Sequence, residues 1–564
     1  MQTTRAEATP RFVWARWDWH KTLRGVRSAV ATREALAYAV LVGAALALRL
    51  VDLSSRAFHH DESQHGYFSW LFSTGHGYHY DPILHGPLRD LITGSFFFLF
   101  GDGDGTARLG SALFGSLLVA LPFLLRRQLG RAAAFSAAVL FCVSPAYLYY
   151  SRFEREDIYV AALTLALTVA VFRFLDRPRP WHPSVILGLL AASFATKETT
   201  YITVFAAGIF FLGAAALEWR EVRAGRLSVR DARLLGPVVR VGRDAWITGG
   251  AVFLAVFTLL FTTFFTNPGG LEDGLVDSIR YWISQQPVGR GGQPPYYYFV
   301  LLPAYELPVL VLGVVGAAVA LRRRSLLGLY LVWATVLNLA LYSWASEKMP
   351  WLVLHPLLPM ILLAGTGFQA LWRNRRRLSA QVALALAAVT AVPMLWGSAS
   401  LNYRHLADPQ ELLVYVQTSQ DVTHVRDVLV GLDGRVRAAT GRPLQLQIDQ
   451  HFTMDWPWYW YLRHLHGAAP ARMDDARYVP PEGTQALLVA ADNRPHLLPR
   501  LRGYTGLRFH HRQWWTPDYA GATVGGVLRW LVYREPWNPS GRGGLDEWLY
   551  IRKGLSAAPA APKR

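Results

Sequence analysis

The chain has 564 residues, of which 52% are hydrophobic and 17% are charged, and its formal net charge is +18. Soluble domains carry about 25% charged residues, so this composition excludes an ordinary soluble protein. The arginines fall in short runs beside long apolar segments, as expected for the loops of a membrane protein rather than for a nucleic-acid interface. The single cysteine, Cys142, excludes an intrachain disulfide bond and a thiolate-rich metal site.

Eleven apolar segments are predicted to form membrane helices, because each approaches the roughly 20 residues that cross a hydrocarbon core. They cover residues 35–51, 107–125, 132–150, 158–175, 184–197, 201–217, 246–265, 300–321, 326–344, 352–372 and 380–398. Segment 89–101 is apolar but too short to span a bilayer, so it is predicted to be an interfacial helix. The predicted fold class is therefore an α-helical polytopic membrane protein.

Residues 400–554 differ in character from the apolar part. Strand-like runs and helix-like stretches alternate in the order 412–419, 422–432, 444–450, 456–466 and 486–492. This alternation predicts a small α/β domain. The last residues, 555–564, are rich in Ala and Pro and are predicted to be a disordered tail.

Basic loops define the predicted orientation. Arginine runs follow every second apolar segment, at 126–131, 173–179, 218–245, 322–324 and 373–377. Because cytoplasmic loops are enriched in Lys and Arg, these loops and the N-terminal segment 1–34 are placed in the cytoplasm. The transmembrane domain then covers 35–399, with an outer loop at 52–106, and the α/β domain 400–554 is extracytoplasmic. The expected location is the plasma membrane.

The predicted outer face carries acids and bases together. HHDESQH, residues 59–65, places three histidines around the adjacent carboxylates Asp61 and Glu62. Further mixed charges occur in SRFERED (151–157), at Lys197-Glu198 and in SEKMPW (346–351). Ionisable groups of both signs that gather at helix ends on one membrane face indicate a functional site.

A metal site remains an alternative explanation of this loop. Its ligands would be His60, Asp61 and His65, since histidine and carboxylate ligands suit zinc or manganese. The spacing is not that of an HExxH motif, however, and no second short histidine pair completes a ligand set.

Transfer of a sugar from a lipid-linked phosphate would suit such a site. This reaction needs a carboxylate that takes the proton of the acceptor hydroxyl, cations that stabilise the departing phosphate, and an apolar groove for the lipid. Asp61 and Glu62 are the candidates for the carboxylate. The candidates for phosphate binding, near the outer ends of other predicted helices, are Arg152, Arg155, Lys197, Lys348 and His355.

The motifs also resemble a known family in their order. DES (61–63) is followed by HGPL…LFG…ARLGSAL within 80–117, by SPAYLYYSRFERED (144–157), by ATKETT (195–200) and by SEKMPWLVLHPLLPMILLAG (346–365). This series is similar to that of the dolichyl-phosphate-mannose protein O-mannosyltransferases and the bacterial aminoarabinose transferases, which have the GT-C fold. The resemblance covers about residues 35–400. It is closest to a prokaryotic mannosyltransferase-like subfamily described as flippase activity-associated.

The resemblance implies roles for individual residues. Asp61 would be the base with Glu62 beside it, Arg152 and Lys197 would contact the donor phosphate, and Asp157 would be a structural or acceptor-side carboxylate. The other residues predicted on the acceptor side or around the acids are His60, His65, His85, Glu154, Glu198 and Glu347. His85 and Glu198 depart from the family. The family often has Lys or Pro at the position of His85, and Gly at the position of Glu198.

Together, the residues and the resemblance predict an inverting membrane glycosyltransferase. Its donor would be a polyprenyl-phosphate-linked sugar, with mannose or another hexose as the expected sugar. Its acceptor would be a protein, a glycan or a lipid at the outer face. No cofactor is expected to be required, with a divalent metal as the alternative. The alternative function is a flippase or flippase-accessory protein for lipid-linked sugars without transferase activity.

Overall fold

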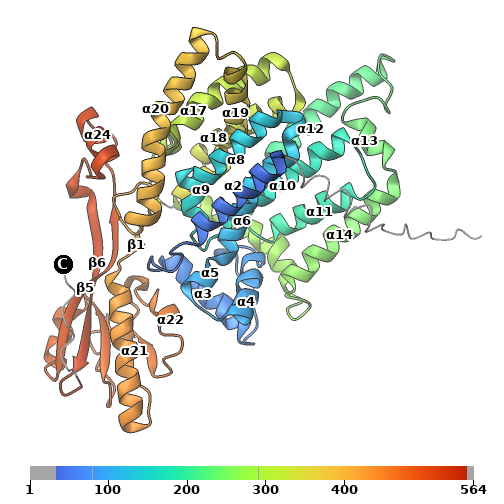
Figure 1. Ribbon diagram of the computed structural model, residues 1–564. Coiled ribbons are helices and arrows are strands. Elements are labelled where there is room, and N and C mark those ends of the chain that lie inside the picture. The colour runs from blue at the N-terminus through green and yellow to red at the C-terminus, as the bar shows by residue number, and fades with distance from the viewer. Residues whose placement is uncertain (1–32, 79, 290, 556–564) are drawn as a thin grey trace, which may run out of the picture.

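The computed structural model describes residues 33–78, 80–289 and 291–555 (Figure 1). Residues 1–32 of the predicted cytoplasmic segment and residues 556–564 of the predicted tail lie outside the described residues. The described chain consists of a helical part that runs to Arg404 and a C-terminal part built around one sheet.

Each of the predicted membrane segments overlaps a helix. The helices are α2 (Arg33–Leu50), α6 (Leu109–Ala120), α8 (Arg131–Val143), α10 (Glu156–Asp176), α11 (His182–Phe194), α12 (Thr199–Arg223), α14 (Arg243–Phe261), α17 (Tyr297–Arg323), α18 (Leu326–Trp344), α19 (Leu354–Arg373) and α20 (Leu378–Ala399). Among the described residues, eight helical segments are long and apolar enough to cross a membrane, and α6 is among them because it is the middle of the longer helical segment Asp104–Leu129. The exceptions are α8 and α11, with 13 residues each, and α2, which carries three charged residues. Eight of the eleven predicted spans are thus supported by length and composition.

Helix α19 forms the centre of the helical part, and 89% of its most apolar window is buried. Glycines bring it into backbone contact with its neighbours. A Cβ added to Gly316 of α17 would lie 1.9 Å from the carbonyl oxygen of Leu363, and one added to Gly365 would lie 2.2 Å from that of Ala133 on α8. Small residues permit this close packing of membrane helices, which holds the helix ends in place.

The predicted segment 132–150 forms two helices rather than one. Helix α8 ends at Val143, and α9 (Pro145–Tyr150) begins after Ser144, whose side chain accepts a hydrogen bond from the backbone N–H of Tyr147. Proline at the first position of a helix cannot continue the preceding helix, because its ring removes a hydrogen bond and clashes with the previous turn. After this break the chain continues through residues 151–155 and enters α10 at Glu156.

The loop 52–106 is largely helical, with α3 (His60–Ser73), η1 (Pro82–Leu84), α4 (Leu88–Phe100) and α5 (Asp104–Ala107). Helix α4 matches the short apolar helix predicted at 89–101. A capping box starts α3: His59 Nδ1 accepts from the backbone N–H of Asp61, and the Glu62 carboxylate accepts from that of His59. The two acids therefore occupy the first helical turn, where the helix dipole favours negative charge.

The C-terminal part contains a six-stranded mixed sheet in the order β1-β5-β6-β4-β2-β3. Its strands are β1 (Gln417–Thr418), β2 (Leu446–Asp449), β3 (Ala468–Ala471), β4 (Ala486–Ala490), β5 (Tyr504–Trp515) and β6 (Arg542–Arg552), and its main helices are α21 (Asp421–Thr440), α22 (Trp458–Tyr461) and α24 (Val524–Tyr533). Strands β2, β3 and β4 are parallel, whereas β5 and β6 are antiparallel.

Several predictions for this domain were wrong in extent. Only two residues of the predicted strand 412–419 are in β1, and only Trp458–Tyr461 of the predicted helix 456–466 is helical. The longest strands, β5 and β6, were missed, because glycines and charged residues interrupt their apolar alternation.

The C-terminal domain docks on the outer loop (Figure 1). Trp460 stacks on Phe58 with ring centroids 5.2 Å apart. Arg463 donates to the Asp102 carboxylate at 2.6 Å, and the backbone N–H of Phe58 donates to the Tyr461 hydroxyl at 2.7 Å. The aromatic run 455–465 therefore packs the domain against α3 and α5.

Candidate functional site

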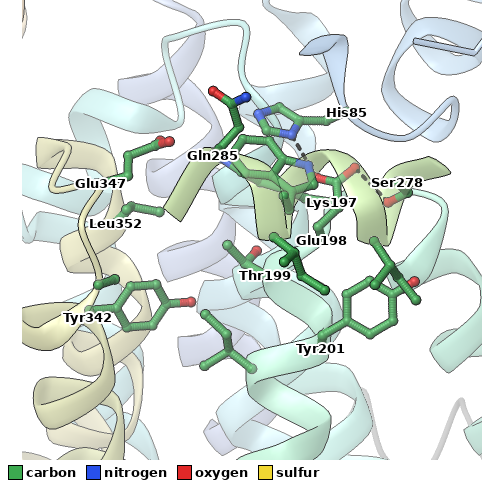
Figure 2. Close-up of a pocket in the computed structure, with 15 residues that line it drawn as sticks. His85, Lys197, Glu198, Thr199, Tyr201, Ser278, Gln285, Tyr342, Glu347 and Leu352 are labelled. Atoms are coloured by element: carbon green, nitrogen blue, oxygen red, sulfur yellow. Dashed lines mark hydrogen bonds and ion pairs between the residues drawn. The ribbon is translucent and has the colours of Figure 1, made fainter. Parts of the chain in front are cut away.

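Two cavities adjoin near the start of α3 and α12. The first, of about 490 Å³, is walled mostly by apolar side chains and has Lys197 and Glu198 at one end. Figure 2 shows Thr199 and Tyr201 of α12 and Tyr342 of α18 around it, beneath the helix α16 (Ser278–Gln285). The second cavity, of about 440 Å³, is lined by charged and apolar side chains together, Asp61 among them, and both cavities are lined by His85, Trp282 and Glu347.

Asp61 faces the second cavity, with 23% of its side chain exposed. Its carboxylate accepts a hydrogen bond from the guanidinium of Arg155 and lies 2.9 Å from Nε2 of His60. Burial alone would raise the pKa of Asp61, but the neighbouring His60 and Arg155 outweigh burial and hold that pKa well below its usual range. Asp61 is therefore an ionised hydrogen-bond acceptor at neutral pH.

Asp157 holds cations at the boundary between the cavities. Its carboxylate accepts from Lys197 Nζ at 3.0 and 2.8 Å and from Arg155 Nε at 3.2 Å. Nε2 of His355 lies 3.4 Å from the same carboxylate. Lysine has three N–H donors and arginine five, so Lys197, in the first cavity, and Arg155, in the second, both keep donors for a ligand.

Glu62 lines neither cavity and is fully buried. Both of its oxygens accept from Arg108, at 2.7 and 2.8 Å, and one also accepts from the backbone N–H of Glu154 at 2.8 Å. Arg56 lies 3.3 Å away. This carboxylate is saturated by fixed donors, so Glu62 anchors the start of α3 and the geometry gives it no access to a substrate.

Three of the predicted phosphate ligands, Arg152, Lys348 and His355, line neither cavity. Arg152 donates to the last carbonyl groups of α2 at 3.0–3.2 Å and to that of Asp52 at 3.2 Å. It therefore satisfies the free carbonyls at a helix C-terminus, a role typical of arginine. Lys348 Nζ donates to the carbonyl of Ala345 at 2.6 Å and lines neither cavity.

His65 connects the second cavity to a buried charge cluster. Its Nε2 lies 3.4 Å from Glu156, which accepts from Arg89 at 2.6 Å. Arg89 also donates to Asp90 at 2.9 Å and lies 3.5 Å from Glu154. Burial raises the pKa of Glu154 to about 8 against the opposing effect of Arg89. Glu154, predicted on the acceptor side, instead belongs to this cluster and lines neither cavity.

The two residues that depart from the family pattern, His85 and Glu198, contact each other in the wall of the first cavity. His85 Nδ1 and Glu198 Oε2 lie 2.8 Å apart (Figure 2). The His85 ring also stacks on that of Trp282, with ring centroids 5.3 Å apart. Glu198 also accepts from the hydroxyl of Tyr80 at 3.1 Å.

Glu347 differs from Glu198 in its hydrogen bonding. Its Oε2 is buried with no hydrogen-bond partner among the described residues, which leaves this oxygen able to accept from a ligand hydroxyl.

The residues around Asp61 do not fit a metal site. Among the described residues, the ligand atoms of His59, His60 and Asp61 lie within 4.8 Å of one another, and His65 is outside this group. His59 Nδ1 accepts the backbone N–H of Asp61 at 3.1 Å, and its Nε2 lies 2.6 Å from the carbonyl of Tyr415. A carbonyl only accepts, so Nε2 carries the proton and His59 has no free lone pair. Two ligands remain, whereas zinc sites use three or four.

The C-terminal domain contributes to the second cavity. Tyr415 and Val416, which precede β1, and Arg512 on β5 line it. Arg512 donates to the carbonyls of Thr453 and Trp456, but its Nε has no hydrogen-bond partner among the described residues. Nothing in the sequence FHHRQWW marks Arg512 as the residue that faces the membrane helices.

Comparisons with known proteins agree with this architecture. The family model described as dolichyl-phosphate-mannose-protein mannosyltransferase matches residues 84–224, which are 141 of the 564 residues. No curated protein matches the chain. ArnT from Cupriavidus metallidurans, solved in the apo state and bound to undecaprenyl phosphate, is similar in structure, with a TM-score of 0.59, 15% identity, and coverage of 92% of this chain and 99% of ArnT.

A second solved structure shows the same arrangement of helices. The apo oligosaccharyltransferase of Archaeoglobus fulgidus has a TM-score of 0.50 and 12% identity, over 81% of this chain and 69% of its own. The chain thus has the GT-C fold that its motifs predicted, and the matching family model indicates a glycosyltransferase.

Proposed function

We propose that this protein is an inverting glycosyltransferase that moves a sugar, mannose or another hexose, from a polyprenyl-phosphate donor to an acceptor hydroxyl. The observation that best supports this proposal is the pair of adjoining cavities, one mostly apolar and one with charged side chains, with shared walls at His85, Trp282 and Glu347. An amphipathic donor fits such a pair, with its lipid in the first cavity and its sugar at the boundary. ArnT, which shares the fold, is described with undecaprenyl phosphate bound.

The donor phosphate would lie at Lys197 and Arg155. Both cations are held by Asp157, and both retain N–H donors that point to neighbouring cavities. A departing monophosphate gains negative charge, and fixed cations in a low-dielectric site stabilise that charge strongly. These two side chains supply the compensating charge, so the proposed reaction requires no metal.

In the proposed step, Asp61 is the base. The acceptor oxygen bonds to the anomeric carbon as the bond from that carbon to the phosphate oxygen breaks. The acceptor proton passes to the Asp61 carboxylate, and the lipid phosphate leaves with the bonding electron pair. Asp61 lines the second cavity and Lys197 the first, so an acceptor beside Asp61 and a phosphate oxygen held by Lys197 would lie on different sides of a sugar bound between the two cavities. This arrangement favours single displacement with inversion.

The acceptor, a protein, glycan or lipid at the extracytoplasmic face of the plasma membrane, would enter the second cavity. There Glu347 offers a free carboxylate oxygen, and Arg512 offers an N–H donor from the C-terminal domain. An acceptor hydroxyl beside Asp61 would therefore be held from both the membrane helices and the sheet.

Turnover of labelled donors by the purified full-length protein tests the proposal. Polyprenyl phosphates carrying different radiolabelled hexoses are incubated in detergent with the protein and with peptide, glycan or lipid acceptors. Release of polyprenyl phosphate and the anomeric configuration of the product are then measured. We expect release with at least one hexose and an inverted product. Retention of configuration would refute the single displacement. Transbilayer movement of the lipid in proteoliposomes, without release from any donor, would instead favour a flippase.

A further inference from the structure

A third cavity lies at the other end of the helical part. It has a volume of about 290 Å³ and lies between α7 (Arg126–Leu129), the end of α10 and the start of α11. Helix α10 contains Asp157 in its first turn and has 21 residues. At about 1.5 Å per residue it spans roughly 30 Å, which is the thickness of a hydrocarbon core. The third cavity therefore lies at the membrane face opposite Asp61.

Positive charge dominates the walls of this cavity. They include one acid and five arginines, namely Asp176, Arg126, Arg127, Arg173, Arg177 and Arg179. Over the described part of the chain, Arg127, Arg173, Arg177 and Arg179 make no side-chain ion pair or hydrogen bond. Membrane orientation accounts for arginines in such loops, but not for the convergence on one hollow of four arginines that have no ion-pair partner among the described residues. The fifth, Arg126, lies 3.9 Å from Glu34. Elsewhere Arg226, for example, pairs with Glu221 at 2.7 Å.

The turn before α11 gives the cavity a defined wall. His182 Nδ1 accepts from the backbone N–H of Arg179 at 3.0 Å, and the ring of His182 stacks on that of Trp181 at 4.0 Å. Trp181 is 51% exposed, which is typical of tryptophan at a membrane–water interface. Oε1 of Gln128 is buried at the cavity with no hydrogen-bond partner within the described residues.

We propose that this cavity binds the phosphate of an anionic phospholipid headgroup. Guanidinium forks match phosphate oxygens in geometry and charge, and Oε1 of Gln128 can accept from a headgroup hydroxyl. Free phosphate would satisfy the arginines equally well. The lipid is favoured because Trp181 and Leu124 line the same cavity and provide apolar contact for the start of an acyl chain. Basic pockets between helix ends are a known form of lipid headgroup site.

The test compares lipid retention by matched variants of the full-length protein. Wild type, the double variant Arg173→Gln/Arg177→Gln and the control Arg322→Gln/Arg323→Gln are purified in detergent and titrated with phosphatidylglycerol, phosphatidylcholine or inorganic phosphate, and binding is followed by native mass spectrometry. The control removes the same charge from the exposed end of α17, outside the cavity. Thermal unfolding verifies that all three proteins are folded.

We expect wild type and control to bind phosphatidylglycerol in preference to phosphatidylcholine. The Arg173/Arg177 variant should bind it about 25-fold more weakly, because each arginine near a headgroup contributes about 1 kcal/mol, or about fivefold. Equal binding by the double variant and wild type would overturn the proposed site. Inorganic phosphate that binds as tightly as the lipid, with the same loss in the double variant, would overturn the lipid as the source of the phosphate.

Discussion

The substitution Asp61→Asn separates catalysis from folding in this protein. Asparagine keeps the shape of the side chain but cannot take the acceptor proton at neutral pH. Loss of a positioned base costs about 10²–10⁴ in rate, which corresponds to roughly 3–5 kcal/mol in the activation barrier. Arg155 keeps Asp157 as a partner, and Asp61 is partly exposed. The free energy of unfolding should therefore change by only about 1 kcal/mol.

The adjacent Glu62→Gln is the matched comparison. Glu62 is fully buried and compensates Arg108 and Arg56, and removing one partner of a buried ion pair costs about 3–5 kcal/mol of stability. We therefore expect Glu62→Gln to lower the unfolding temperature strongly, whereas Asp61→Asn lowers kcat alone.

The assay measures release of polyprenyl phosphate from a labelled donor, together with thermal unfolding of each purified variant. Asp61→Asn that turns over within a factor of three of wild type would refute the assignment of Asp61 as the base. A Glu62→Gln variant that is as stable as wild type but inactive would show that the two carboxylates have been assigned the wrong way round.

Other expectations concern the acceptor, the pH, the lipid and metals. Arg512→Gln should raise the KM for the acceptor several-fold and leave the KM for the donor unchanged, because Arg512 lines the second cavity only; equal KM values for the acceptor would contradict this. Glu154→Gln should be close to wild type in thermal stability at pH 5 and exceed it above pH 8. The pKa of Glu154 is raised to about 8 in the folded state, so wild type loses stability as the pH rises from about 4.5 to about 8. A constant offset at all pH values would be inconsistent with this cause. Ile279 lines the first, mostly apolar cavity. Ile279→Asp should therefore raise the KM for the donor at least tenfold in initial-rate measurements. An unchanged KM would show that the donor lipid binds elsewhere. Treatment with a chelator should leave turnover unchanged, and an activity that is lost and then restored by zinc or manganese would disprove the metal-free proposal.

The membrane helices were the most predictable part of this fold. Long apolar segments have few alternatives in a bilayer, since every backbone group must be satisfied within the helix. The sheet was harder to predict, because β5 and β6 are half-exposed and bear charged residues on both faces. Their pairing depends on contacts between residues that are distant in sequence, and local alternation does not reveal such contacts.

The candidate site was predictable by position but not by the role of each residue. Asp61 and Glu62 are neighbours in sequence, yet consecutive residues on a helix point about 100° apart, so one faces the cavity and the other faces Arg108. Likewise, Arg155 rather than Arg152 reaches the second cavity, because the turn after α9 directs Arg152 to the end of α2. The spacing of these residues in the sequence does not show which of Asp61 and Glu62, or which of Arg152 and Arg155, faces the second cavity. The structure of the intervening turns is needed for that.

The C-terminal sheet is held at two distant points (Figure 1). At one end α22 packs on α3, and at the other α24 packs on α20. There Arg534 pairs with Glu411 at 2.9 Å, and Glu411 accepts a hydrogen bond from the hydroxyl of Tyr305 on α17. Strand β5 connects these ends and carries Arg512 between them. A domain attached at both ends cannot open by rotation about a single hinge. In the proposed reaction, the acceptor would therefore have to enter from the side, between the sheet and the membrane helices. Acceptors would then be selected by the width of that passage, and extended chains or single lipid headgroups would pass more readily than folded domains.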